Sequence, residues 1–296
     1  ARFRERSRDK WKLPRDPAWY LETARHLPPP APVHPVGGGL RNRILYDFAW
    51  QAANYALWPK FPHFRTHRPY PIWREYATWL RRLSQLPRLK RHAVALQEKL
   101  FAQKGRYFLF PLQLDSDTQI RIHCRWRSLS LVIEHVIDSF ARHAPEDTSL
   151  VLKNHPLDNG MINYNRLIRQ QSEQLGLADR IHFIDGGDLD QLSKHAAGVV
   201  TVNSTAATVA LASGIPTIAL GNAVFDIPGL TFQDGLRRVW SESRCGQGVD
   251  LILLNAFRRV VEALTQINGN LYTAAGMRIA LHLCSIRLQR GDFETH

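Results

Sequence analysis

The chain has 296 residues, of which 44% are hydrophobic and 22% charged, and its formal net charge is +13. This composition supports one large folded domain or two smaller ones and excludes a chain too polar to bury a core. No stretch approaches the ~18 consecutive apolar residues of a membrane-spanning helix, and the first ten residues carry no apolar signal-peptide core.

The positive charge is concentrated in the first third of the chain. Residues 1–106 hold 22 Lys and Arg against 7 Asp and Glu, whereas residues 107–296 hold 17 against 19. A basic segment of this kind fits an anionic partner, which could be phospholipid headgroups, an anionic glycan or nucleic acid. The alternative is a solvated basic face without a partner.

Residues 1–41 are predicted to form a basic arm or linker, because the PPPAP and GGG stretches interrupt regular elements. Residues 42–104 are predicted to be a basic helical segment, since apolar side chains recur at helical spacing in 44–58, 73–86 and 92–100. Trp side chains among Arg and Lys are typical of membrane interfaces, and equally of ordinary helix packing. The cysteines Cys124, Cys245 and Cys284 lie far apart without a CxxC pair, which predicts free thiols and no zinc site.

Beyond residue 104, apolar strands alternate with helices. Strands are predicted over 107–112, 149–156, 181–185, 198–203 and 216–221. Helices are predicted over 130–144, 162–176, 189–196 and 204–214, with two more over 251–266 and 271–289. Strands that are apolar on both faces and alternate with helices indicate a parallel sheet sandwiched by helices. The predicted class is therefore an α/β, Rossmann-like domain over residues 105–296.

Polar side chains follow four of the predicted strands at the points where these strands end. Ligands of such sheets bind outside the carboxyl ends of the strands, so we expect these side chains to converge on one crevice. They are Gln113, Asp115 and Asp117 after the first strand, Lys153, His155 and Pro156 after the second, Asn203, Ser204 and Thr205 after the fourth, and Asn222 after the fifth.

The residue types at these strand ends suit an anionic ligand. Ser204 and Thr205 precede a helix, whose free N–H groups can bind phosphate or carboxylate; the alternative is an ordinary cap. Pro156 fixes the backbone beside His155. The imidazole, with Lys153 on the same side of the strand, could stabilise a phosphate leaving group; the alternative is a structural strand-end histidine.

Asp115 and Asp117 form a pair of carboxylates two residues apart. A carboxylate in a sheet crevice can act as a nucleophile, a base or a metal ligand, and the alternative is a turn that caps a helix. The sequence contains neither a phosphate-binding P-loop nor a GxGxxG motif, which argues against nucleoside triphosphatases and dehydrogenases.

Three stretches resemble the bacterial capsule polysaccharide biosynthesis family, which includes the KpsS-, LipB- and KpsC-type β-Kdo transferases. These stretches are FPLQLDSDTQI (110–120), LKNHPLD (152–158) and the segment 201–231 that begins TVNSTAAT. The likeness covers roughly residues 105–245, and its PLQ and KNHPLD forms are closer to the KpsS type.

The resemblance implies a GT-B-like half of a retaining glycosyltransferase. Such an enzyme moves Kdo from CMP-Kdo to a (lyso)phosphatidylglycerol acceptor during synthesis of the capsule linker, without a cofactor or a metal. By position it implies a carboxylate nucleophile at Asp117, phosphate contacts at His155 and Pro156, and further donor contacts at Ser204 and Thr205. The other strand-end residues, Gln113, Asp115, Lys153, Asn203 and Asn222, would line the same site.

The implied partners are a CMP-sugar, an anionic phospholipid, the inner-membrane surface and other capsule-assembly proteins. The expected location is cytoplasmic and peripheral on that membrane. A GT-B enzyme has two Rossmann-like domains, and we expect the second upstream of this chain. Two alternatives stay open: a transferase of this fold that uses another sugar nucleotide, and a non-catalytic export factor that binds glycan or lipid. Nucleic-acid binding by the basic arm is a distant fourth hypothesis.

Overall fold

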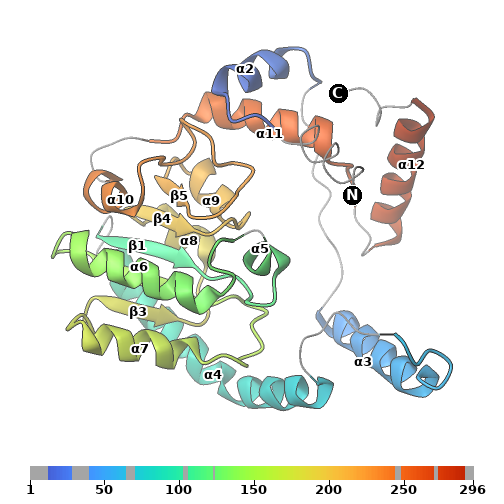
Figure 1. Cartoon of the computed structure of the whole chain (residues 1–296), viewed down its shortest axis with the longest axis horizontal. Helices are drawn as coiled ribbons and strands as arrows, with labels where there is room; N and C mark the ends of the chain where they lie inside the picture. Colours follow the sequence, from blue (N-terminus) through green and yellow to red (C-terminus); the bar gives the residue numbers. More distant parts are fainter. Residues whose placement is uncertain are drawn as a thin grey trace. The chain divides into compact units, whose positions relative to one another are not determined.

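A parallel sheet of five strands, with helices on both faces, builds one part of the structure (Figure 1). The strands are β1 (Tyr107–Pro111), β2 (Ser149–Lys153), β3 (Ile181–Ile184), β4 (Gly198–Thr201) and β5 (Thr217–Ala219), in the spatial order β3-β2-β1-β4-β5. Every neighbouring pair is parallel. The predicted α/β class and all five predicted strands are confirmed.

This computed structural model describes residues 13–28, 40–64, 71–102, 106–122, 124–243, 248–269 and 273–290. The chain divides into two compact units, one of which contains Leu13–Trp19 and Pro69–Asn255, and therefore the whole sheet. The other contains Tyr20–Arg68 and Ala256–His296. The predicted segment boundaries near residues 41 and 104 stay predictions.

Helices cover both faces of the sheet because side chains of a strand alternate between its faces. On one face, Phe108, Phe110 and Leu150 pack in the cluster that includes side chains of α6 (Leu129–His143), α7 (Tyr164–Gln174) and α10 (Leu236–Glu242). On the other face, Tyr107 and Leu109 pack with side chains of α4 (Ile72–Ala102), α8 (Leu189–Lys194) and α9 (Ala207–Ala212). Burial on both sides explains why the strands read as continuous apolar runs.

Helix α2 (Pro17–Arg25) corrects the predicted arm, because it lies inside residues 1–41. Proline is favoured in the first turn of a helix, where its missing N–H costs nothing. Asp16 precedes it and accepts a hydrogen bond from the Ala18 N–H over 3.0 Å, as a helix cap does. The stretches PPPAP and GGG themselves fall largely outside the described residues.

The predicted basic helical segment is present as α3 (Leu40–Leu57) and α4, and α4 runs through Pro87. In the unit without the sheet, α2 packs on α11 (Leu251–Thr265), with the rings of Tyr20 and Phe257 5.4 Å apart. The chain's last described helix is α12 (Ala274–Arg290). Among the described residues, no helix combines the length and the apolar character needed to cross a bilayer. Cys124 and Cys284 are free thiols, and Cys245 lies outside the described residues.

Candidate functional site

The chain reverses its direction of travel across the sheet between β1 and β4. From β1 it proceeds to β2 and β3 on one side, and then returns to β4 and β5 on the other. In open parallel sheets the ligand site lies at this reversal, outside the carboxyl ends of the strands. The ends of β1 and β2 are level, since Pro111 pairs with Lys153 and the Leu112 N–H donates to the Lys153 carbonyl over 2.8 Å. The predicted site residues therefore follow strands that end at one edge.

Gln113 and Asn203 join the loops after β1 and β4. The Gln113 Nε2 donates to the Asn203 Oδ1 over 3.0 Å, and the Asn203 N–H donates to the Gln113 Oε1 over 3.3 Å. The Asn203 Nδ2 also donates to the Gln119 carbonyl over 3.1 Å. Both side chains are buried, so their bonds to each other fix the two loops side by side. Contact of either residue with a donor stays a prediction.

Asp115 and Asp117 each cap a helix with one carboxylate oxygen. The Asp115 Oδ1 accepts from the Leu129 N–H at the start of α6 over 3.0 Å. The Asp117 Oδ1 accepts from the Gln119 N–H over 2.9 Å at the start of the short α5 (Thr118–Arg121). Within the described part of the chain, the second oxygen of Asp117 has no hydrogen-bond donor, so this oxygen is available for chemistry.

His155 sits half-buried in the turn after β2. Its Nδ1 accepts from the Leu157 N–H over 3.1 Å, so the neutral ring carries its proton on Nε2 and presents a donor there. Burial lowers the pKa of His155; the positive charges of Lys153 and Arg82 act in the same direction, and the carboxylates of Asp158 and Asp117 oppose it. The Asp117 carboxylate, from the loop after β1, thus acts on a ring in the loop after β2.

A buried ionic cluster lies beside this turn, and the sequence did not single it out. The Arg82 guanidinium, from α4, contacts the Asp185 carboxylate over 2.7 Å and the Asp158 carboxylate over 3.5 Å. The Asn154 Nδ2 donates to both carboxylates, each over 3.1 Å. Burial lowers the pKa of Lys153 as well, against the raising effect of Asp185 and of the next carboxylate, Asp188. The carboxylates that act on Lys153 therefore both follow β3.

The cluster floors a cleft of about 330 Å³ between α4 and the loops after β2 and β3. Asp158 belongs to the quoted LKNHPLD stretch, and Asp185 ends the predicted strand 181–185, so the strand-end rule could have found both. Arg82 carries no such signal, because a contact across 103 residues of chain leaves no local pattern.

Ser204, Thr205 and Asn222 follow β4 and β5. The Ser204 Oγ accepts from the Ala206 N–H over 3.2 Å, and the Ser204 N–H donates to the Thr201 hydroxyl over 3.2 Å. Helix α9 begins at Ala207, which corrects the predicted start at residue 204: the Ser204 side chain forms a turn before the helix. Thr205 and Asn222 are exposed, as is Pro156 in the turn after β2.

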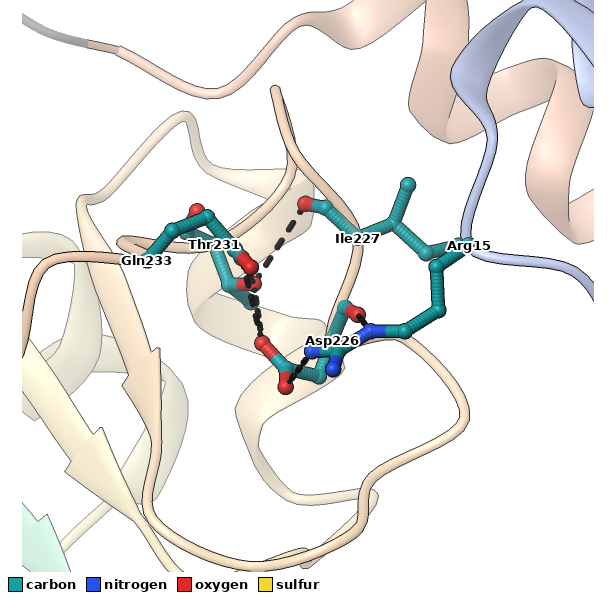
Figure 2. A network of polar contacts seen from close by, with 5 residues as sticks. All are labelled: Arg15, Asp226, Ile227, Thr231 and Gln233. Carbon is teal, nitrogen blue, oxygen red and sulfur yellow. Dashed lines mark hydrogen bonds and ion pairs between the residues drawn. The ribbon is translucent and has the colours of Figure 1, made fainter.

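The loop after β5 is tied to the N-terminal part of the chain (Figure 2). Arg15 pairs with the Asp226 carboxylate, and its Nε donates to the Asp226 carbonyl over 2.8 Å. The second Asp226 oxygen accepts from the Thr231 hydroxyl over 2.8 Å and from the Gln233 Nε2 over 3.2 Å. This loop thus has its own clamp. It follows β5, the edge strand opposite to β3, near which the Arg82 cluster lies.

Comparison with known proteins places this chain in a family. The family model described as "Capsule polysaccharide biosynthesis protein" matches residues 8–272, which include all the predicted site residues. The chain belongs to the capsule polysaccharide biosynthesis protein family. The resemblance seen in the sequence is confirmed.

The chain is 34% identical over 264 residues to the capsule polysaccharide export protein KpsS of Escherichia coli, covering 88% of this chain and 66% of KpsS. It is 33% identical over 270 residues to the capsule polysaccharide modification protein LipB of Neisseria meningitidis serogroup B, covering 88% of this chain and 62% of LipB. The chain therefore spans less than two thirds of the length of these relatives. Among solved structures it is similar to the β-Kdo 2,7 transferase KpsC of Thermosulfurimonas dismutans, with 18% identity, a TM-score of 0.36, and coverage of 57% of this chain and 52% of KpsC.

Proposed function

We propose that this chain holds the donor-binding half of a GT-B-like, retaining glycosyltransferase. In this proposal it moves Kdo from CMP-Kdo to a (lyso)phosphatidylglycerol acceptor in the synthesis of the capsule linker. The observation that carries the proposal is the convergence of the loops after β1, β2 and β4 at the reversal point of the sheet, where the Leu112 N–H bonds the Lys153 carbonyl and Gln113 bonds Asn203. Membership of the capsule family supports the sugar chemistry.

The donor carries a phosphate and a carboxylate, so its site needs hydrogen-bond donors. The Nε2–H of His155 would donate to the phosphate, and the Ser204–Thr205 turn would contact the phosphate or the sugar carboxylate. The imidazole suits this role in either protonation state, because Nε2 carries a proton both in this neutral tautomer and in the imidazolium. Bonds to a charged group are the stronger ones.

The nucleophile in this proposal is the uncapped oxygen of Asp117. It attacks the anomeric carbon, a carbon–oxygen bond to the enzyme forms, and the bond from that carbon to the phosphate oxygen breaks with its electron pair on CMP. The acceptor hydroxyl oxygen then displaces Asp117 from the same carbon while its proton passes to solvent, and two inversions give net retention. The helix cap on the other oxygen would orient the carboxylate.

Helix α4 supplies the surface proposed to meet an anionic membrane on its cytoplasmic side. Trp73 and Leu80 lie seven residues apart on one stripe of the helix and are 64% and 69% exposed. Arg74, Arg81 and Arg88, also seven apart, form the adjacent stripe and are exposed. Exposed apolar side chains beside cations are typical of helices that lie on anionic lipid.

The relatives' own names favour a second candidate. KpsS is named an export protein and LipB a modification protein, so a non-catalytic capsule export factor is the competing function. Asp117→Asn separates the two functions. A transferase would lose turnover and keep its affinity for CMP, whereas an export factor would have no turnover to lose and would keep its binding properties.

The donor is tested by calorimetric titration of this chain with CMP, CMP-Kdo, a CMP-sialic acid and a UDP-sugar. The proposal predicts that CMP and CMP-Kdo bind and that the UDP-sugar does not. Preferential binding of the UDP-sugar would instead assign a transferase of the same fold to another donor, and binding of none of them would reject the donor-binding role.

A further inference from the structure

We propose that Arg82 is the positioning residue of His155: from α4 it clamps the turn 154–158 and so fixes the direction of the imidazole. This inference rests on the proposed function, because it gives His155 the task of holding the donor phosphate. Nothing in the local sequence of α4 distinguishes Arg82 from the exposed arginines at 74, 81 and 88; burial and partners do.

The clamp is a closed set of charged contacts. The guanidinium contacts Asp185 over 2.7 Å and Asp158 over 3.5 Å, and all three side chains are at most 13% exposed. The Asn154 amide bridges the same two carboxylates, donating to each over 3.1 Å. Away from water such contacts are strong, and a missing member is costly because the remaining charges are left uncompensated.

The clamp reaches the imidazole through the backbone of the turn. The Asn154 Oδ1 accepts from the His155 N–H over 2.9 Å, and the Asp158 N–H donates to the His155 carbonyl over 3.0 Å. The Leu157 N–H, between these two points, donates to the ring at Nδ1 over 3.1 Å. Both residues that hold the His155 backbone are thus themselves held by Arg82, directly or through the carboxylates.

Removal of Arg82 leaves two buried carboxylates bonded to one neutral amide, with Lys153 as the cation that still acts on Asp185. Their repulsion opens the turn, which breaks the bond from Leu157 to the ring and frees the imidazole to take either neutral tautomer. The charged groups around the ring are Asp158, Lys153, Asp117 and Arg82. Loss of the Arg82 charge and loss of burial both raise the pKa of His155, so the two effects have the same sign.

The experiment compares Arg82→Gln and Arg82→Lys with Arg15→Gln as the matched control, which breaks an Arg–Asp pair on the loop after β5. Imidazole NMR reports the tautomer and the titration midpoint of His155, and calorimetry reports the affinity for CMP. In the wild type we expect one Nε2–H tautomer. In Arg82→Gln we expect both tautomers and a higher titration midpoint of His155. We also expect CMP binding to weaken about tenfold, because one hydrogen bond to a charged group is lost. Arg15→Gln should change none of these.

Arg82→Lys keeps the charge balance and loses the fork that reaches both carboxylates, so it decides the matter if Arg82→Gln fails to fold. A folded Arg82→Lys with the wild-type tautomer, midpoint and CMP affinity overturns the inference. A changed imidazole in a chain whose wild type binds no CMP supports the clamp and refutes the donor role. The two failures are therefore distinguishable.

Discussion

Two loops at the carboxyl edge of the sheet are each held by an arginine from an earlier part of the chain, and the two clamps differ in burial. The side chains of Arg82, Asp158 and Asp185 are 9%, 13% and 11% exposed. At the other side of the sheet, Arg15 is 63% exposed and its partner Asp226 17%. The same pairing chemistry therefore operates in two dielectric environments.

The geometry of an ion pair therefore does not by itself determine how much the pair contributes to the free energy of unfolding. An exposed pair contributes ~0–1 kcal/mol, because water screens it and side-chain entropy opposes it. A buried pair contributes little over an apolar substitute, yet removing one partner costs ~3–5 kcal/mol, because the other charge stays buried. Loss of one partner in the clamp at the His155 turn is therefore expected to cost much stability, and loss of one partner in the clamp on the loop after β5 is expected to cost little.

The largest expected effect is on stability. Arg82→Gln should lower the free energy of unfolding by ~3–5 kcal/mol, whereas Arg15→Gln should lower it by at most ~1 kcal/mol. Urea denaturation of both variants beside the wild type measures this. Equal losses would mean that burial does not separate the two clamps.

The next effect is on membrane binding by α4, in which Arg82 is buried and three other arginines are exposed. Replacing Arg74, Arg81 and Arg88 by Gln should weaken binding to vesicles containing phosphatidylglycerol by ~1 kcal/mol per residue, and leave the fold intact because Arg82 is kept. Vesicle co-sedimentation measures this, with Gln at Arg142, Arg166 and Arg169 on α6 and α7 as a control of equal charge. Equal binding to neutral and anionic vesicles would remove the membrane role of α4.

A smaller effect is expected on nucleotide binding. His155→Ala removes the proposed bond to the donor phosphate, which is worth ~1.5–3 kcal/mol, so CMP affinity should fall by about one to two orders of magnitude. Gln233→Ala, in the loop after β5, should leave CMP affinity unchanged. Calorimetry with CMP compares the two variants, and an unaltered affinity in His155→Ala would contradict the phosphate contact.

The smallest effect is on the pH dependence of stability. Burial lowers the pKa of His155 in the folded state, so the neutral ring favours folding above the unfolded pKa of ~6.5. This contribution is lost as the pH falls from there through the folded pKa. His155→Asn keeps an acceptor for the Leu157 N–H without titrating. Its unfolding free energy, compared with wild type between pH 7.5 and ~5, should therefore fall less steeply; parallel curves would count against a buried neutral His155.

Sequence reasoning found the sheet because its strands are apolar on both faces, a pattern that local composition records. The ends of these apolar runs also located the loops that follow the strands, and Gln113 and Asn203 do join two of these loops. It missed α2, which begins at Pro17 inside the predicted arm. It missed Arg82 because a clamp between α4 and the end of β3 arises only from the folded topology, in which distant segments of chain meet.

The proposed reaction is glycosyl transfer at the edge formed by the loops after β1, β2 and β4. Its most direct test is mass spectrometry of lipid products after incubation of the chain with CMP-Kdo and phosphatidylglycerol. We expect a lipid heavier by one Kdo residue with the wild type and none with Asp117→Asn. Absence of that product from the wild type, or its undiminished formation by Asp117→Asn, would refute glycosyl transfer by Asp117.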